Sequence, residues 1–420
     1  MNLPPILGHA GVATVDMAGA ATVSIALYAF IRCLENPAWQ RLILLGAAIA
    51  FAFLCKFSSL AFLASCFFCA FAYIALGRLP LRHVQWRRLI GRMSIVSAVA
   101  FVVLWGGYRF SWQPLSAHGV APQKVDRAFA DKSLLRTLAQ KAIEVPIPLS
   151  QLIIGIYKVG SHNADGSDSY LFGEFRHTGW WYFFPVVVGV KSPIGFLVLA
   201  GCGIFVIMRR FRRSVWQQHL TVVFPVAIML VCMSSRIDLG VRHVLPIYPL
   251  LAVIGGHAMS NFFVLARRTS PALAIIPIVL AVWVVADSWM TRPDHLAYFN
   301  RFAGSHPERI LAESDLDWGQ DLYRLSRRLK ELQVDHLSLM YFGPGVFAPG
   351  RAAYTAVLEN AGLPPYSILS ASAPATHGYV AISVRYLTLE YARDGSFAWL
   401  KDRTPLEIIG KSIYLYNLGE

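Results

Sequence analysis

Eight apolar stretches dominate this sequence and limit what it can fold into. They cover residues 12–31, 42–55, 60–76, 93–105, 182–208, 220–233, 244–265 and 271–289. Hydrophobic residues make up 56% of the chain and charged residues only 15%. A soluble fold would leave much of this apolar surface in water, whereas a bilayer can cover it. Some stretches fall below the roughly 20 residues of a perpendicular span, so one can be broken or thin the membrane locally. We therefore expect an α-helical polytopic membrane protein with about eight transmembrane helices.

Short basic segments separate these stretches. Their residues are Arg32 and Arg41; Arg78, Arg82, Arg87, Arg88 and Arg92; Arg209, Arg210, Arg212 and Arg213; and Arg267 and Arg268. Eight membrane crossings place all four basic segments on one side, which the positive-inside rule makes cytoplasmic. The loop 107–181 and the region after residue 290 are then extracytoplasmic.

The net charge of +14 does not indicate nucleic-acid binding. The arginines sit between apolar stretches, without the basic, aromatic-rich surface that binds single strands. Cys66 and Cys69 have metal- or redox-pair spacing, but their apolar neighbours favour simple packing.

The sequence divides into four expected regions. Residues 1–106 hold the first four transmembrane helices, 107–181 an extracytoplasmic loop with interfacial helices, 182–290 the last four transmembrane helices, and 291–420 a small soluble α/β domain. Within the last region, leucines at helical spacing predict a helix over 319–332. Apolar, β-branched and aromatic runs predict strands at 336–342, 379–386 and 412–418.

Charged residues at the membrane boundary are costly and mark candidate functional positions. Five gather near the extracytoplasmic face: Asp16, Lys56, Lys191, Arg242 and His243. The first four each have a purely structural alternative. The acid can offset a helix dipole, the lysines can extend to the interface, and the arginine can pair with a nearby aspartate. Three cations and one carboxylate at this boundary suit a lipid with a phosphate head group.

The most distinctive polar run spans residues 313–321. Asp315, Asp317 and Asp321 could supply oxygen ligands to a divalent cation. Alternatively, Asp315 or Asp317 caps the helix predicted to begin near Gly319, and we favour the cap because an Asp-x-Asp pair alone is weak evidence for a metal. The sequence contains no recognisable Ser–His–Asp set, phosphate-binding glycine loop or zinc-ligand spacing.

Four segments resemble one family. They are His9–Asp16, Tyr182–Pro193, Arg242–Pro249, and Tyr298–Gly304 leading into the run Ser314–Leu322 that contains Trp318 and Gln320. The resemblance is to bacterial members of the protein-mannosyltransferase-like group of polyprenyl-phosphate-dependent membrane glycosyltransferases, of the GT-C type. The last segment is the most specific of the four.

The resemblance implies a membrane glycosyltransferase that moves a sugar from a polyprenyl-phosphate donor to a glycan, lipid or protein acceptor. Transfer would occur at the extracytoplasmic face of the bacterial inner membrane. A carboxylate would act as general base, and Lys56, Lys191, Arg242 and His243 would bind the donor phosphate. Direct attack by the acceptor would invert the anomeric centre.

One departure concerns the catalytic acid, which in this family usually lies in the first extracytoplasmic loop. The resemblance places Met1 near the family's third helix, so we expect a truncated chain, a misplaced start or an inactive protein. Asp16 resembles a second acidic position on the same face and is the catalytic candidate here. The alternative function is a non-catalytic lipid-phosphate-binding or flippase-like membrane protein. A transporter would need charges or broken helices near the bilayer midplane, whereas these charges gather at one face.

Overall fold

The computed structural model describes residues 2–12, 14–76, 86–119, 133–343, 351–372 and 377–419. Arg78, Arg82 and the part of the predicted loop at 120–132 lie outside these residues.

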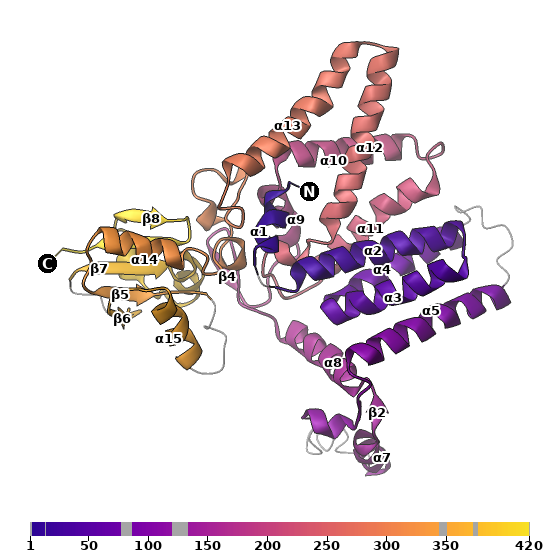
Figure 1. Ribbon diagram of the computed structural model, residues 1–420, viewed down its shortest axis with the longest axis horizontal. Helices are drawn as coiled ribbons and strands as arrows, with labels where there is room; N and C mark the ends of the chain where they lie inside the picture. Colours follow the sequence, from indigo (N-terminus) through magenta and orange to yellow (C-terminus); the bar gives the residue numbers. More distant parts are fainter. Residues whose placement is uncertain are drawn as a thin grey trace. The chain divides into compact units, whose positions relative to one another are not determined.

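Each predicted apolar stretch coincides with a helix or a pair of helices (Figure 1). These are α2 (Asp16–Glu35), α3 (Trp39–Cys55), α4 (Ser58–Ala75), α5 (Trp86–Gly107), α9 (Phe183–Lys191) with α10 (Ile194–Arg209), α11 (Trp216–Met233), α12 (Ile247–Arg268), and η3 (Pro271–Ala274) with α13 (Ile275–Met290). Within the described part of the chain, five of them are long and apolar enough to cross a membrane. The pair α9 and α10 makes a sixth if it counts as one span, and it is bent by 118°. The apolar helical parts of α3 and α5 are shorter. The chain is thus a helical integral membrane protein, as predicted.

The chain forms two compact units. The N-terminal unit contains Val15–Asp165 and Arg212–Val231, and the C-terminal unit contains Met1–Thr14, Gly166–Phe211 and Cys232–Glu420. In the N-terminal unit α2 packs on α3 and α4, and α3 packs on α5 (Figure 1). Its loop region carries β1 (Trp112–Gln113), η1 (Leu115–His118), α7 (Ser133–Glu144), β2 (Ile147–Pro148) and α8 (Ser150–Asp165). The segment 145–149, which contains Pro146 and Pro148, separates the helices α7 and α8.

In the C-terminal unit, α10 packs on α12 and α13. Glycine allows the first of these contacts, because a Cβ at Gly203 would lie 2.2 Å from the carbonyl oxygen of Ile254. This unit also contains a short helix that the sequence did not predict, α1 (Pro4–Ala10), and the hairpin of β3 (Ser169–Leu171) and β4 (Glu174–Arg176).

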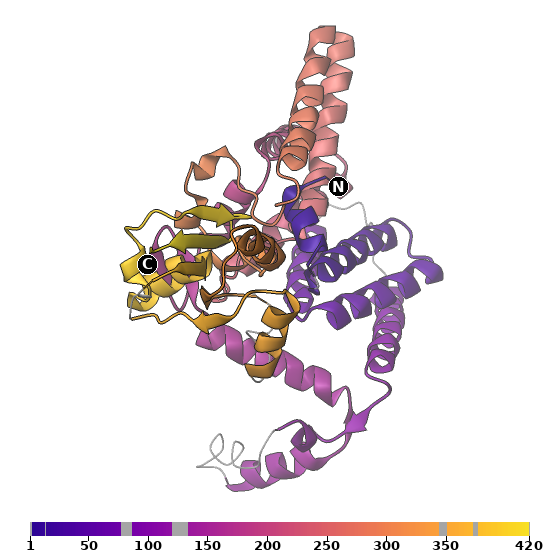
Figure 2. The same cartoon turned by 60° about the vertical axis from the view of Figure 1, so that its left-hand side comes forward.

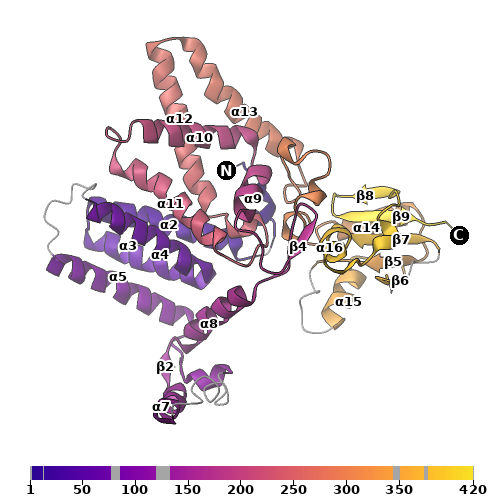
Figure 3. The ribbon, with the colours of Figure 1, turned by 180° about the vertical axis from the view of Figure 1, so that it is seen from behind.

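The C-terminal α/β region is built on a five-stranded sheet in the order β6-β5-β7-β9-β8 (Figures 2 and 3). The strands are β5 (Leu337–Met340), β6 (Tyr366–Ile368), β7 (Tyr379–Ser383), β8 (Glu407–Ile409) and β9 (Ile413–Asn417). The first three are parallel, β9 runs antiparallel to β7, and β8 antiparallel to β9. The three predicted strands are present, while β6 and β8 are additional.

Both faces of this sheet are covered, because its strands alternate apolar side chains between two cores. Leu337, Leu339 and Ala381 pack with α14 (Leu322–Glu331) and α15 (Arg351–Asn360). Val380 and Ile382 pack on the opposite face. Short helical segments complete the region: η7 (Tyr386–Glu390), α16 (Tyr391–Asp394) and η8 (Ala398–Leu400) after β7, and η4 (Arg301–Ala303), η5 (Pro307–Arg309) and η6 (Glu313–Asp315) before α14.

Candidate functional site

In the N-terminal unit, Asp16 and Lys56 form an ion pair. Asp16 is the first residue of α2 and Lys56 follows the last residue of α3, so both lie at one end of this antiparallel helix pair. The Lys56 Nζ lies 2.5 Å from the Asp16 carboxylate, whose side chain is 6% exposed. A buried carboxylate with an ammonium partner is a tolerable charge at the end of two membrane helices.

Gly19 leaves room for the lysine side chain beside α2. A Cβ at Gly19 would lie 3.2 Å from the Cβ of Lys56 and 3.4 Å from its Cδ. The lysine side chain therefore runs across a bare patch of α2, one turn from Asp16.

In the C-terminal unit, Lys191 is buried at the end of α9 and is 1% exposed. Its ammonium donates to the carbonyl oxygens of Leu296 at 2.7 Å and Asp315 at 2.6 Å, and lies 4.2 Å from the centre of the Phe299 ring. These contacts tie α9 to the chain after α13 and to the acidic run. They favour a positioning role for Lys191.

The acidic run holds the turn that precedes α12. The Val241 N–H donates to the Asp315 carboxylate at 3.0 Å, and the Ser314 hydroxyl donates to the carbonyl of Leu239. Gly240 has φ 102°, and a Cβ there would lie 2.5 Å from an Asp315 carboxylate oxygen. Glycine is thus required at this position for conformation and for space. These contacts fix the turn that carries Arg242 (η2, Val241–His243).

Asp317 and Gln320 make hydrogen bonds to neighbouring residues within the run itself. Asp317 accepts from the Gly319 N–H at 2.8 Å. The Gln320 amide donates to the Leu316 carbonyl at 2.9 Å and accepts from the Trp318 N–H at 2.8 Å. The expected helix cap at Asp315 or Asp317 is therefore wrong: α14 begins only at Leu322, because the intervening residues form turns.

Asp321 occupies the position just before α14, without a side-chain cap bond. Its carboxylate instead accepts from the Ser412 hydroxyl at 2.7 Å and from Arg324 at 3.0 Å. Asp321 thereby links α14 to the turn before β9.

Burial raises the pKa of all three aspartates. It raises the pKa of Asp317 to about 7, opposed by bonds from Gly319 and Ser383. Burial raises the pKa of Asp321 to about 6. It also raises the pKa of Asp315 to about 6, although the nearby Lys191 charge lowers it. Each carboxylate is engaged separately. Within the described ranges, no group of three or more His, Cys, Asp or Glu residues is arranged to hold a metal ion.

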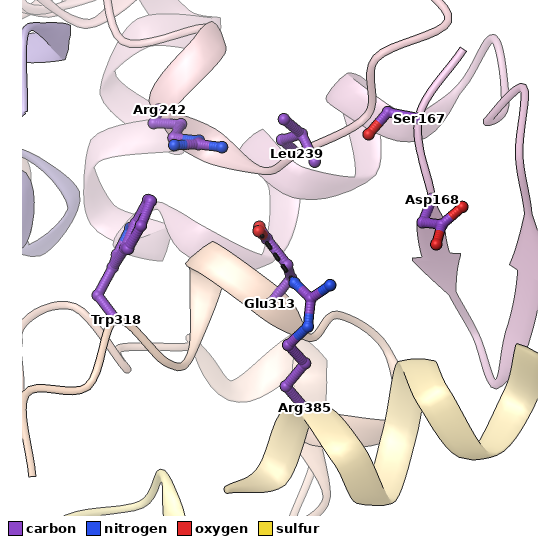
Figure 4. Close-up of a pocket in the computed structure, with 7 residues that line it drawn as sticks. All are labelled: Ser167, Asp168, Leu239, Arg242, Glu313, Trp318 and Arg385. Atoms are coloured by element: carbon purple, nitrogen blue, oxygen red, sulfur yellow. Dashed lines mark hydrogen bonds and ion pairs between the residues drawn. The ribbon is translucent and has the colours of Figure 1, made fainter. Parts of the chain in front are cut away.

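A cavity of about 340 Å³ lies beside the fixed turn (Figure 4). It is lined by Ser167, Asp168, Leu239, Arg242, Glu313, Trp318 and Arg385, all from the C-terminal unit. In Figure 4, Arg242 and Trp318 lie on one side, Ser167 and Asp168 on the other, and Glu313 and Arg385 side by side between them.

Arg242 is the predicted phosphate ligand that borders this cavity. Its guanidinium lies 4.9 Å from the centre of the Trp318 ring. Its Nε is buried and makes no hydrogen bond to any residue in the described part of the chain. His243 instead stacks on Phe184, with ring centres 6.4 Å apart, and is not among the lining residues.

Sequence reasoning missed most of the cavity. Glu313 opens the acidic run but was not selected, and Ser167, Asp168 and Arg385 were not considered. One signal was available for Arg385, because it lies at the carboxyl end of the strand predicted at 379–386, and ligands gather at the carboxyl ends of parallel strands.

Comparisons with known proteins give two matches. A family model described as dolichyl-phosphate-mannose-protein mannosyltransferase matches residues 2–105 and confirms the predicted resemblance for that segment. A crystal structure of ArnT from Cupriavidus metallidurans bound to undecaprenyl phosphate aligns with a TM-score of 0.44 and 13% sequence identity, covering 98% of this chain and 77% of that one. The comparison with curated proteins gives no match.

Proposed function

We propose that this protein is a membrane glycosyltransferase that uses a polyprenyl-phosphate-linked sugar as donor. The observation that carries the proposal is the Asp16–Lys56 pair. It places a buried carboxylate and an ammonium at one end of two membrane helices. Both residues fall inside the segment that matches the mannosyltransferase family model.

The proposed reaction is a direct displacement at the sugar's anomeric carbon. The acceptor hydroxyl oxygen forms the new bond as its proton passes to the Asp16 carboxylate. The bond between the anomeric carbon and the phosphate oxygen breaks, and its electron pair stays on the polyprenyl phosphate. Lys56 is the cation proposed to stabilise charge on that phosphate from the N-terminal unit.

In the C-terminal unit, Arg242 is a separate candidate for binding a phosphate group, because it lines the cavity and its guanidinium lies over the Trp318 ring. A guanidinium matches phosphate geometry with two parallel hydrogen bonds. We retain His243 as a second candidate and assign Lys191 to positioning the acidic run. The acceptor is a glycan, a lipid or a protein, and the proposed location is the extracytoplasmic face of the inner membrane.

The test uses the full chain in proteoliposomes with radiolabelled polyprenyl-phosphate mannose and membrane extract as acceptor source. Loss of a general base lowers rates by about 10²–10⁴-fold, so Asp16→Asn should reduce release of polyprenyl phosphate at least 100-fold. Lys56→Gln should reduce it by a similar factor. The matched controls are Asp165→Asn and Lys158→Gln, which change exposed residues of α8 and should retain wild-type rates. Wild-type turnover in Asp16→Asn refutes its role.

One observation favours the flippase-like alternative. The 118° bend between α9 and α10 interrupts an apolar stretch, and broken helices are common in transporters. A flippase would move the intact donor between leaflets without releasing polyprenyl phosphate. The same proteoliposomes distinguish the two functions when lipid sidedness and donor cleavage are measured together.

A further inference from the structure

The cavity beside Arg242 is placed where α/β folds bind ligands. Strands β6, β5 and β7 are parallel, with β5 in the middle. The chain passes from β5 to β6 on one side, and then to β7 on the other side of β5. Such an order creates a crevice between β5 and β7 at their carboxyl ends. Arg385 lies two residues beyond β7, lines the cavity, and stacks on Phe342, two residues beyond β5, at 4.4 Å.

The lining has the composition of a site for a polar ring. It combines two guanidinium groups, two carboxylates, a hydroxyl and an indole. This mixture supplies donors and acceptors in similar number and a balanced formal charge, whereas a site for phosphate alone would need an excess of positive charge. The volume of about 340 Å³ falls at the lower end of the range for small-molecule sites, which suits one sugar ring.

Two donors at this cavity lack partners. Arg242 Nε and Trp318 Nε1 are buried, and neither makes a hydrogen bond within the described ranges. Buried donors are normally satisfied, so the wall formed by Arg242 and Trp318 keeps unused hydrogen-bonding capacity. The Trp318 ring holds the guanidinium by its face, which leaves the guanidinium's in-plane N–H groups available to an anion.

Glu313 is held in a strained conformation at the cavity wall. Its φ is 58°, in the left-handed region that side-chain-bearing residues rarely adopt. Arg385 fixes its carboxylate at 3.2 Å, and its other oxygen accepts from the Ser314 N–H at 2.5 Å. A strained backbone conformation of this kind persists only where surrounding contacts hold the residue in place. Such residues are concentrated at ligand-binding sites.

We infer that this cavity binds the sugar ring of a glycosyl phosphate. Arg242 binds the phosphate, and Glu313 and Asp168 accept hydrogen bonds from ring hydroxyls. This inference rests on the proposed function and assigns recognition of the donor sugar to the C-terminal unit. Glu313 is then a specificity-determining residue that distinguishes a sugar phosphate from phosphate alone.

Binding to the full chain in detergent tests this without any transfer reaction. Calorimetry would compare mannose 1-phosphate, mannose and inorganic phosphate. Mannose 1-phosphate should bind most tightly. Glu313→Gln should weaken it at least 10-fold and leave phosphate binding within 2-fold. Arg242→Gln should weaken both anions, and Arg327→Gln, on the exposed face of α14, should change nothing.

A second variant separates binding from folding. Glu313→Gly relieves the positive φ, so its thermal midpoint should stay within about 2 °C of wild type or rise while mannose 1-phosphate affinity falls. A large fall in the midpoint with unchanged affinity would make Glu313 merely structural and overturn the inference. Equal binding of phosphate and mannose 1-phosphate, or no binding of either, would overturn it too. Donor cleavage that persists in these cases leaves the proposed function standing.

Discussion

Lys56 and Asp16 show how one glycine can permit a charged pair at a membrane boundary. The lysine side chain crosses α2 over Gly19, and its ammonium meets the carboxylate at 2.5 Å. Both residues were predictable as candidates because they are charged and lie at the membrane boundary. Their direct pairing needed the helix packing that brings their ends together.

Removing one partner of this pair should destabilise the protein more than removing both. Lys56→Met leaves a buried carboxylate without its cation, which destabilises by about 3 kcal/mol, whereas Lys56→Met with Asp16→Asn should recover most of that loss. Thermal unfolding of both variants in detergent measures the difference. Equal losses in the single and double variants would show that the pair does not couple.

Asp317 should make stability depend on pH. Its pKa is raised by burial from 3.8 to about 7, so the folded protein binds more protons than the unfolded chain between these values. Stability therefore falls as pH rises from about 4 to 7, by at most about 1.4 kcal/mol per pH unit for this group. Asp317→Asn should make the thermal midpoint fall less steeply over pH 4–8, and the raised pKa values of Asp315 and Asp321 should maintain part of the slope. An unchanged slope in the variant would contradict this assignment.

At the scale of elements, the contact between α10 and α12 depends on the close approach of the two helix backbones at Gly203 and Ile254. Gly203→Ala places a methyl group where the Ile254 carbonyl lies, and such overpacking typically destabilises by about 1–3 kcal/mol. Gly201→Ala, on the same helix with open space around it, is the matched control and should change little. A thermal midpoint for Gly203→Ala equal to that of the control would refute close packing.

Lys191 should stabilise the packing of α9 against the segments that contain Leu296 and Asp315. Lys191→Met removes two hydrogen bonds to buried carbonyl oxygens, so the thermal midpoint should drop by an amount equivalent to about 2–4 kcal/mol. Lys158→Met on the exposed face of α8 is the control. If Lys191→Met kept its thermal midpoint and lost only donor binding, the lysine would be a phosphate ligand instead.

The helices were predictable because long apolar stretches have few alternatives in a membrane protein. The bend after Lys191 and the short elements α1, β6 and β8 were not, because brief segments carry little periodicity. The cavity was least predictable, since Asp168, Glu313 and Arg385 are distant in sequence and meet only through tertiary packing.

At the scale of the whole molecule, the predicted topology places the C-terminal α/β region outside the cytoplasm. A membrane-impermeant maleimide should therefore label Lys401→Cys in spheroplasts, and should label Arg212→Cys only after the membrane is permeabilised. Both sites are exposed, and the native cysteines lie in or beside apolar stretches. The reverse pattern would invert the topology.

The central claim concerns the donor. Purified chain in proteoliposomes, supplied with membrane extract as the acceptor source, should consume polyprenyl-phosphate mannose and release one polyprenyl phosphate for each mannose transferred, while leaving GDP-mannose intact. Donor that crosses the bilayer uncleaved, or mannose taken from GDP-mannose instead, would contradict the claim.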